Sequence, residues 1–189
     1  MALLGQMLLP AAQVQAASRK ALKAYKNYMQ KQSKDSIFAV FYLDKDSVPD
    51  LIYYLPSKEI YTWKNNQMKR VYSFDLYSGE MPEGHRITYY YKKKGAFITI
   101  PHVGVAGCSG ENYYVYKNNK YVPALGRTKS PEGVKYWRYK PGKYSKYTPT
   151  AITKSQFHKA LKKQVGTKKA TKIKYYSNTA KNRNKQICK

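Results

Sequence analysis

The spacing of apolar positions changes along this chain of 189 residues. From Ser18 to about Gln32 apolar side chains recur at helical spacing, with Leu22, Tyr25 and Met29 on one stripe and lysines on the other faces. Ser18 is a suitable N-cap for such a helix. The pattern predicts an amphipathic helix near the N-terminus.

From Ile37 the period of the apolar positions becomes two and stays so for about a hundred residues. The strands that this pattern predicts lie at 37–43, 50–55, 59–63, 68–74, 86–91, 96–100, 112–116, 120–123, 134–139 and 143–147. Short turns separate them, among them Lys93-Lys94-Gly95 and Pro141-Gly142, as expected of successive hairpins.

Helical spacing returns after the strands. Thr153 and Gln156 have the spacing of a capping box, an apolar stripe runs from Phe157 to Val165, and Gly166 follows as a stop. A short strand at 172–176 and a last helical turn are expected after this helix. The predicted fold class is α+β, an antiparallel sheet of successive hairpins with an N-terminal helix and a C-terminal helix. A purely β-sandwich packing is the alternative.

The first sixteen residues differ in composition from the rest. They carry no charge and consist of an apolar run followed by a small-residue site that ends at Ala16, which is typical of a secretory signal. Pro10 argues against a buried helix there, and the run is too short to span a bilayer. We expect a signal segment at 1–16 and a single α+β domain at 17–189. The expected location is extracellular, either secreted or associated with the cell wall.

The charge of the chain is strongly basic and unevenly placed. The formal net charge is +26, every Asp and Glu lies at or before Glu132, and 17 of the 36 Lys and Arg residues lie beyond it. Lysine predominates, and its ammonium lacks the planar guanidinium with which arginine donates two parallel hydrogen bonds to one anion. This predicts diffuse, salt-sensitive attraction to polyanions. The candidate polyanion-binding residues are Lys154, Lys159, Lys162, Lys163, Lys168, Lys169, Lys172 and Lys174.

An aromatic-x-aromatic-basic motif occurs four times, ending at Lys64, Lys92, Lys117 and Lys140. Residues two apart in a strand share a face, so each motif places two rings together. The rings could form a row of stacking platforms for sugar rings or bases, or they could stabilise the sheet by cross-strand packing, which is the favoured interpretation. The candidate glycan-stacking residues are Trp63, Tyr91, Tyr116 and Trp137.

The most distinctive local motif contains Asp44, Asp46 and Asp50 between two apolar strands. Oxygen ligands at alternate positions of a tight loop suit Ca²⁺, so calcium is the one cofactor that the sequence indicates. The segment resembles the loop written DLDGDGIPELI, which is common in exported bacterial proteins. Tyr42 stands where the first acid of that loop would be, and this weakens the ligand set. The alternative is a structural turn in which the aspartates accept hydrogen bonds from loop amides.

The order of these features is similar to that of small secreted proteins of Gram-positive gut clostridia. The similarity includes the KALKAYKNYM helix, the FAVFYLDKDSVPDLIYY segment, the Tyr- and Lys-rich hairpins and the closing KIKYYSNTAKNR stretch. It covers most of the mature chain, and the segment 38–52 is its specific part. The resemblance implies export and this fold, with no assigned activity.

The chain has two cysteines, Cys108 and Cys188. An even pair in an exported chain predicts a disulfide. The competing interpretation makes Cys108 a nucleophile with His102 or His85 as its base. Three scattered histidines and the lack of a cysteine pair at ligand spacing argue against zinc.

Two functions follow from these features. The first is a secreted or cell-surface, non-enzymatic protein that binds anionic polymers or glycans through its lysine-rich C-terminal face. Its expected partner is an anionic wall polymer or a host glycan, because the usual nucleic-acid-binding modules are absent. The alternative is a Cys-dependent secreted enzyme that uses Cys108 with His102.

Overall fold

The computed structural model describes residues 11–54, 57–75, 87–100, 107–141 and 147–187. Its helices are α1 (Ala11–Gln30), α2 (Lys154–Val165) and α3 (Ala180–Ile187). Its strands are β1 (Ile37–Phe41), β2 (Asp50–Tyr54), β3 (Ser57–Lys64), β4 (Gln67–Asp75), β5 (Ile87–Tyr91), β6 (Ala96–Thr99), β7 (Ser109–Lys117), β8 (Lys120–Ser130), β9 (Gly133–Lys140), β10 (Thr148–Ile152), β11 (Thr171–Lys172) and β12 (Tyr176–Ser177).

The strands form two antiparallel sheets. Sheet A has the order β12-β1-β2-β3-β4, and sheet B has the order β10-β9-β8-β7-β6-β5-β11. The predicted α+β class with successive hairpins is confirmed, although the hairpins divide between two sheets. Two of the hairpin turns place paired asparagines at positive φ: Asn65 and Asn66 at 53° and 58°, and Asn118 and Asn119 at 51° and 61°. Asparagine tolerates this left-handed conformation, which the tight two-residue turns require.

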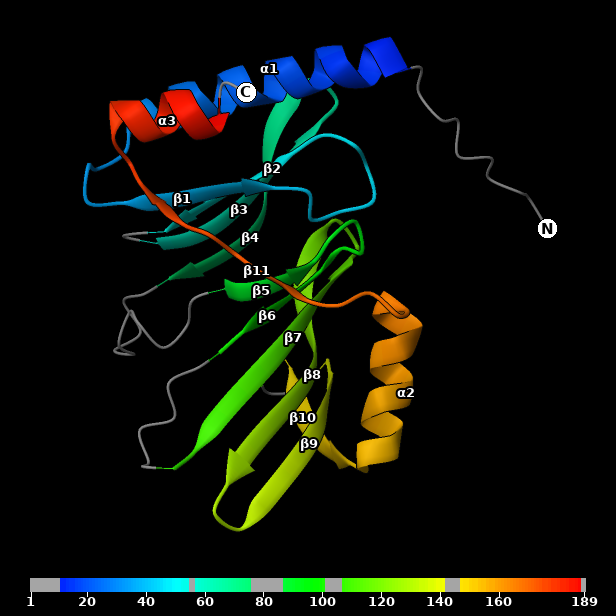
Figure 1. Cartoon of the computed structure of the whole chain (residues 1–189). Helices are drawn as coiled ribbons and strands as arrows, with labels where there is room; N and C mark the ends of the chain where they lie inside the picture. The colour runs from blue at the N-terminus through cyan, green and yellow to red at the C-terminus, as the bar shows by residue number, and fades with distance from the viewer. Residues whose placement is uncertain (1–10, 55–56, 76–86, 101–106, 142–146, 188–189) are drawn as a thin grey trace, which may run out of the picture.

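The two sheets share one hydrophobic core. Phe41 and Ile60 of sheet A are buried in the same cluster as Phe97 and Tyr121 of sheet B. The Phe97 ring also meets the ring of Tyr72 from sheet A edge-on, with centroids 5.2 Å apart. Figure 1 shows α1 and α3 beside sheet A, and α2 beside sheet B.

Helix α1 starts earlier than the sequence pattern predicts. The expected start at Ser18 is wrong, because the helix already begins at Ala11. Alanine and glutamine are good helix formers and extend the helix upstream. The predicted apolar stripe is confirmed, since Tyr25 and Met29 are fully buried against sheet A. Residues 1–10 lie outside the described residues, so the secretory signal stays a prediction.

Helix α2 begins with the predicted capping box. The Thr153 hydroxyl accepts a hydrogen bond from the Gln156 amide at 3.2 Å, and the Gln156 side chain accepts one from the Thr153 amide at 3.0 Å. The helix ends at Val165, before Gly166 at φ 66°. Phe157 and Val165 are buried against sheet B, so the helix presents its apolar stripe to that sheet as predicted.

The chain ends differently from the expectation. In place of one strand at 172–176 there are two short strands in different sheets, since β11 pairs with β5 and β12 pairs with β1. A complete helix, α3, follows where a single turn was expected. The strand predicted at 143–147 falls mostly on residues outside the described ones, and β10 begins at Thr148.

Candidate functional site

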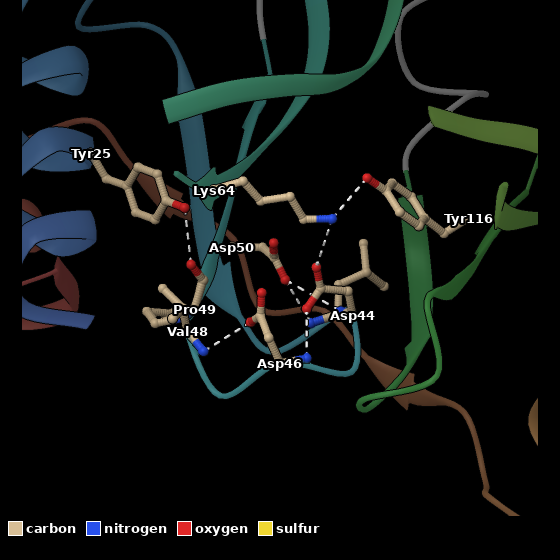
Figure 2. Close-up of polar contacts among 9 residues, drawn as sticks. Tyr25, Asp44, Asp46, Val48, Pro49, Asp50, Lys64 and Tyr116 are labelled. Atoms are coloured by element: carbon tan, nitrogen blue, oxygen red, sulfur yellow. Dashed lines mark hydrogen bonds and ion pairs between the residues drawn. The ribbon is translucent and has the colours of Figure 1, made fainter. Parts of the chain in front are cut away.

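The acidic loop between β1 and β2 is held by its own aspartates (Figure 2). Asp50 accepts hydrogen bonds from the amides of Leu43 at 2.9 Å and Asp44 at 3.4 Å. The Asp44 carboxylate accepts a bond from the Asp46 amide at 3.0 Å, and Asp46 accepts one from Val48 at 2.9 Å. This is the geometry of the turn interpretation, in which each carboxylate satisfies loop amides.

The loop is also the meeting point of α1 and the two sheets. The Tyr25 hydroxyl of α1 donates to the Pro49 carbonyl at 2.9 Å. On the other side, the turn between β5 and β6 donates backbone hydrogen bonds from Lys93 to Tyr42 at 3.1 Å and from Gly95 to Leu43 at 2.8 Å. The position of the loop therefore depends on contacts with α1 and with the β5–β6 turn of sheet B.

Lys64, at the end of β3, places a cation beside the loop. Its ammonium lies 3.9 Å from the Asp44 carboxylate and donates to the Tyr116 hydroxyl of sheet B at 2.9 Å (Figure 2). The same ammonium lies 4.5 Å from the centre of the Tyr116 ring. A fixed ammonium next to Asp44 competes electrostatically with a bound cation.

Among the residues that the structure describes, no three His, Cys, Asp or Glu side chains are placed to share a metal ion. Calcium binding by Asp44, Asp46 and Asp50 stays a prediction. The arrangement supports the structural alternative, because the carboxylate oxygens are engaged by loop amides and by Lys64.

Burial changes the titration of Asp46 and Asp50. Burial, followed by repulsion from Asp44, raises the pKa of Asp46 to about 7. The same two causes raise the pKa of Asp50 to about 8, against the hydrogen bond from the Leu43 amide, which lowers it. Both carboxyls therefore bind protons more tightly in the folded protein than in an unfolded chain.

This titration predicts how stability depends on pH. Because the folded state binds more protons, the contribution of the loop is most favourable near pH 4 and is lost as the pH rises to about 8. Asp46→Asn keeps the acceptor for the Val48 amide and removes the charge. We expect it to raise the free energy of unfolding by about 1 kcal/mol at pH 8 and to have little effect at pH 5.

Urea unfolding of the wild type and Asp46→Asn at both pH values measures this difference. Asp35→Asn is the matched control, because Asp35 is exposed outside the loop. A difference between wild type and Asp46→Asn that is the same at pH 5 and pH 8 contradicts the expectation.

The eight candidate lysines are all exposed and occupy α2 and the chain that follows it. They do not form one stripe. Lys159 and Lys163, one turn apart, line a groove between α2 and sheet B, whereas Lys154 lines a separate depression beside Trp137. Lys172 lies on β11, and the Lys174 ammonium lies 5.6 Å from the centre of the Tyr176 ring.

The four candidate stacking rings lie in different parts of the molecule. Trp63 packs in the cluster beneath α1, and Tyr91 is 6% exposed in the cluster beneath α2. Tyr116 packs against the core between the sheets. Trp137 is half-buried and donates from its indole nitrogen to Thr128 at 3.4 Å. These positions favour the packing interpretation, and glycan stacking stays a prediction.

The predicted disulfide between Cys108 and Cys188 is not supported, because Cys108 is a free cysteine. Cys108 directly precedes β7 of sheet B, whereas Ile187, which precedes Cys188, is buried beside α1 and sheet A. A disulfide needs Cα atoms within about 7 Å. Cys188 and His102 lie outside the described residues, so catalysis by Cys108 with His102 also stays a prediction.

Two features of the site were not predicted from the sequence. The first is Lys64 as the cation of the acidic loop, although it is the basic residue of the first aromatic-x-aromatic-basic motif. The second is the groove beside α2. The apolar stripe of α2 predicted one buried helix face, but the groove beside it is lined by side chains from five strands as well as from the helix.

The comparisons with known proteins give no relative. No protein-family model matches the chain, and no curated protein sequence or solved structure matches it. Within the described ranges, no helix is long and apolar enough to cross a membrane. The functional conclusions therefore depend on the residues and their arrangement.

Proposed function

We propose that this chain is a secreted or cell-surface, non-enzymatic protein that binds anionic polymers through its C-terminal lysines. The expected ligand is an anionic wall polymer or a host glycan. The observation that carries the proposal is that eight lysines on α2 and the segment after it are exposed, in a part of the sequence with no carboxylate side chain after Glu132.

The arrangement of these lysines supports diffuse binding. Phe157 and Val165 anchor α2 to sheet B, so the lysine side chains of the helix extend into water. Exposed ammonium groups in a segment without Asp or Glu raise the local concentration of a polyanion and release its counterions on contact. Such binding selects for charge density and only weakly for chemical structure.

The quadruple variant Lys162→Gln, Lys163→Gln, Lys168→Gln and Lys169→Gln tests the proposal. We expect its affinity for heparin and for wall teichoic acid to fall roughly tenfold at low salt, because half of the candidate cations are lost. The affinity of the wild type should itself fall steeply between about 50 and 200 mM salt. Binding is measured by retention on immobilised polymer and by titration at both salt concentrations.

A second quadruple variant serves as the control. Glutamine at Lys20, Lys23, Lys31 and Lys34 removes the same number of charges from exposed positions on α1 and the turn after it. If this control weakens binding as much as the C-terminal variant, net charge alone is responsible and the C-terminal face is not the site. Wild-type binding that does not change with salt would contradict an electrostatic mechanism.

A further inference from the structure

A groove of about 970 Å³ lies between α2 and sheet B. On the helix it extends from Gln156 to Val165, roughly 14 Å at the rise of an α-helix. Figure 1 shows α2 running alongside the strands of sheet B. A volume of this size is within the range of small-molecule sites in proteins.

The groove is lined by aliphatic side chains and by tyrosines, and its aliphatic part, here called the floor, is only partly covered. Val115 and Val122 face each other across β7 and β8 in the strand register, and both are half-buried. Ala124 and Leu161 also line the groove and are half-buried. Aliphatic side chains left partly open to water gain free energy when an apolar ligand covers them.

The rim of the groove is basic. The cations that line it come from the β7–β8 turn, from β9 and from α2, and they are Lys117, Lys120, Arg138, Lys159 and Lys163. Among the residues that the structure describes, no Asp or Glu lines the groove, and none of these five cations forms an ion pair with a carboxylate. The rim therefore has positive charge available for an anion.

Floor and rim together specify the ligand class. A fully polar polyanion would leave the aliphatic floor in water, and a neutral apolar molecule would not use the cations. We propose that the groove binds a single anionic amphiphile, with its carboxylate, sulfate or phosphate head among the lysines and its aliphatic chain on the floor. This site goes beyond the diffuse polyanion binding proposed above and does not depend on it.

The site is tested by titration calorimetry with decanoate below its micellar concentration. The buffer contains about 150 mM salt, which screens long-range electrostatic attraction. We expect saturable binding of one molecule, with affinity rising about two- to fourfold for each methylene from octanoate to decanoate. Decyltrimethylammonium should not bind, and decyl maltoside should bind more weakly than decanoate.

Two pairs of substitutions on α2 distinguish binding in the groove from attraction to the net charge of the protein. Lys159→Gln with Lys163→Gln removes rim cations and should weaken decanoate binding about tenfold. Lys154→Gln with Lys162→Gln removes the same charge from positions that do not line the groove and should change binding less than about twofold. Val122→Glu places a carboxylate on the floor and should weaken binding more than tenfold, provided that its thermal melt shows a folded protein.

Three results would overturn the proposal: no binding of decanoate at millimolar concentration, equal binding of the cationic amphiphile, or equal loss of binding in the two lysine pairs. Retention on heparin is measured on the same variants. Normal heparin retention without decanoate binding rejects the groove alone. Loss of salt-sensitive heparin retention with normal decanoate binding rejects the polyanion proposal alone.

Discussion

Phe97→Ala is expected to lower the free energy of unfolding by about 3–5 kcal/mol. The Phe97 side chain is fully buried at the junction of the two sheets. Its ring stacks on Tyr114 at a centroid distance of 4.9 Å and meets Tyr72 of sheet A and Tyr121 of β8 at 5.2 and 5.0 Å. Truncation removes these ring contacts and leaves a cavity between two sheets that cannot easily close it.

Each sheet contains one tryptophan, so tryptophan fluorescence can follow the unfolding of each sheet separately. Trp63 lies on β3 of sheet A and Trp137 on β9 of sheet B, so replacing either one by Phe leaves a fluorescence probe for the other sheet. In the Phe97→Ala background both probes should report the same lowered urea midpoint. Val134→Ala is the control, because Val134 is 44% exposed. A loss below about 1 kcal/mol, or an unchanged midpoint for sheet A, would contradict a shared core.

Asn178→Asp is expected to destabilise the fold by about 3 kcal/mol at neutral pH. Asn178 is 1% exposed, and its side-chain amide donates to the carbonyls of Met29, Gln32 and Ser33 at 2.8, 3.3 and 3.0 Å. These carbonyls at and just after the end of α1 need donors. A carboxylate would face them with no proton to donate, although Arg183, which contacts the Asn178 side-chain oxygen at 2.8 Å, would offset part of its charge.

The pH dependence of this variant separates charge from lost packing. A buried aspartate next to carbonyl oxygens has a raised pKa, so its destabilising effect should shrink as the pH falls and the carboxyl becomes a donor. Thermal unfolding between about pH 4 and 8 measures this change. Asn184→Asp is the control, because Asn184 is exposed on α3, the helix that follows Asn178. An equal effect of the two substitutions would show that Asn178 does not hold the end of α1.

Local features of the fold were predictable because their causes are local. The capping box at Thr153 fixed the start of α2, and the alternating pattern identified most strands of the hairpins. The loop of Asp44, Asp46 and Asp50 was recognisable from its spacing, and its turn geometry follows from side chains that bond amides two residues away.

The tertiary arrangement was not predictable from the same patterns. Alternation shows that a strand has one buried face, but it does not show which other face covers it, so one sheet was expected where there are two. The bond from Lys64 to Tyr116 joins positions 52 apart in the sequence, and the bond from Asn178 to Met29 joins positions 149 apart. The disulfide was inferred from cysteine count, which carries no information about the distance between β7 and α3.

The last strands of the chain have a consequence for the order of folding. β11 forms one edge of sheet B, and β12, which begins four residues after β11 ends, forms one edge of sheet A. Figure 1 shows this segment passing from α2 across both sheets to α3. Domains generally begin to fold from the N-terminus during synthesis. Here both sheets keep an open edge, and α1 lacks its bonds from Asn178, until the segment from β11 to Asn178 has been made. The edge pairings of both sheets therefore form only after this segment has been synthesised.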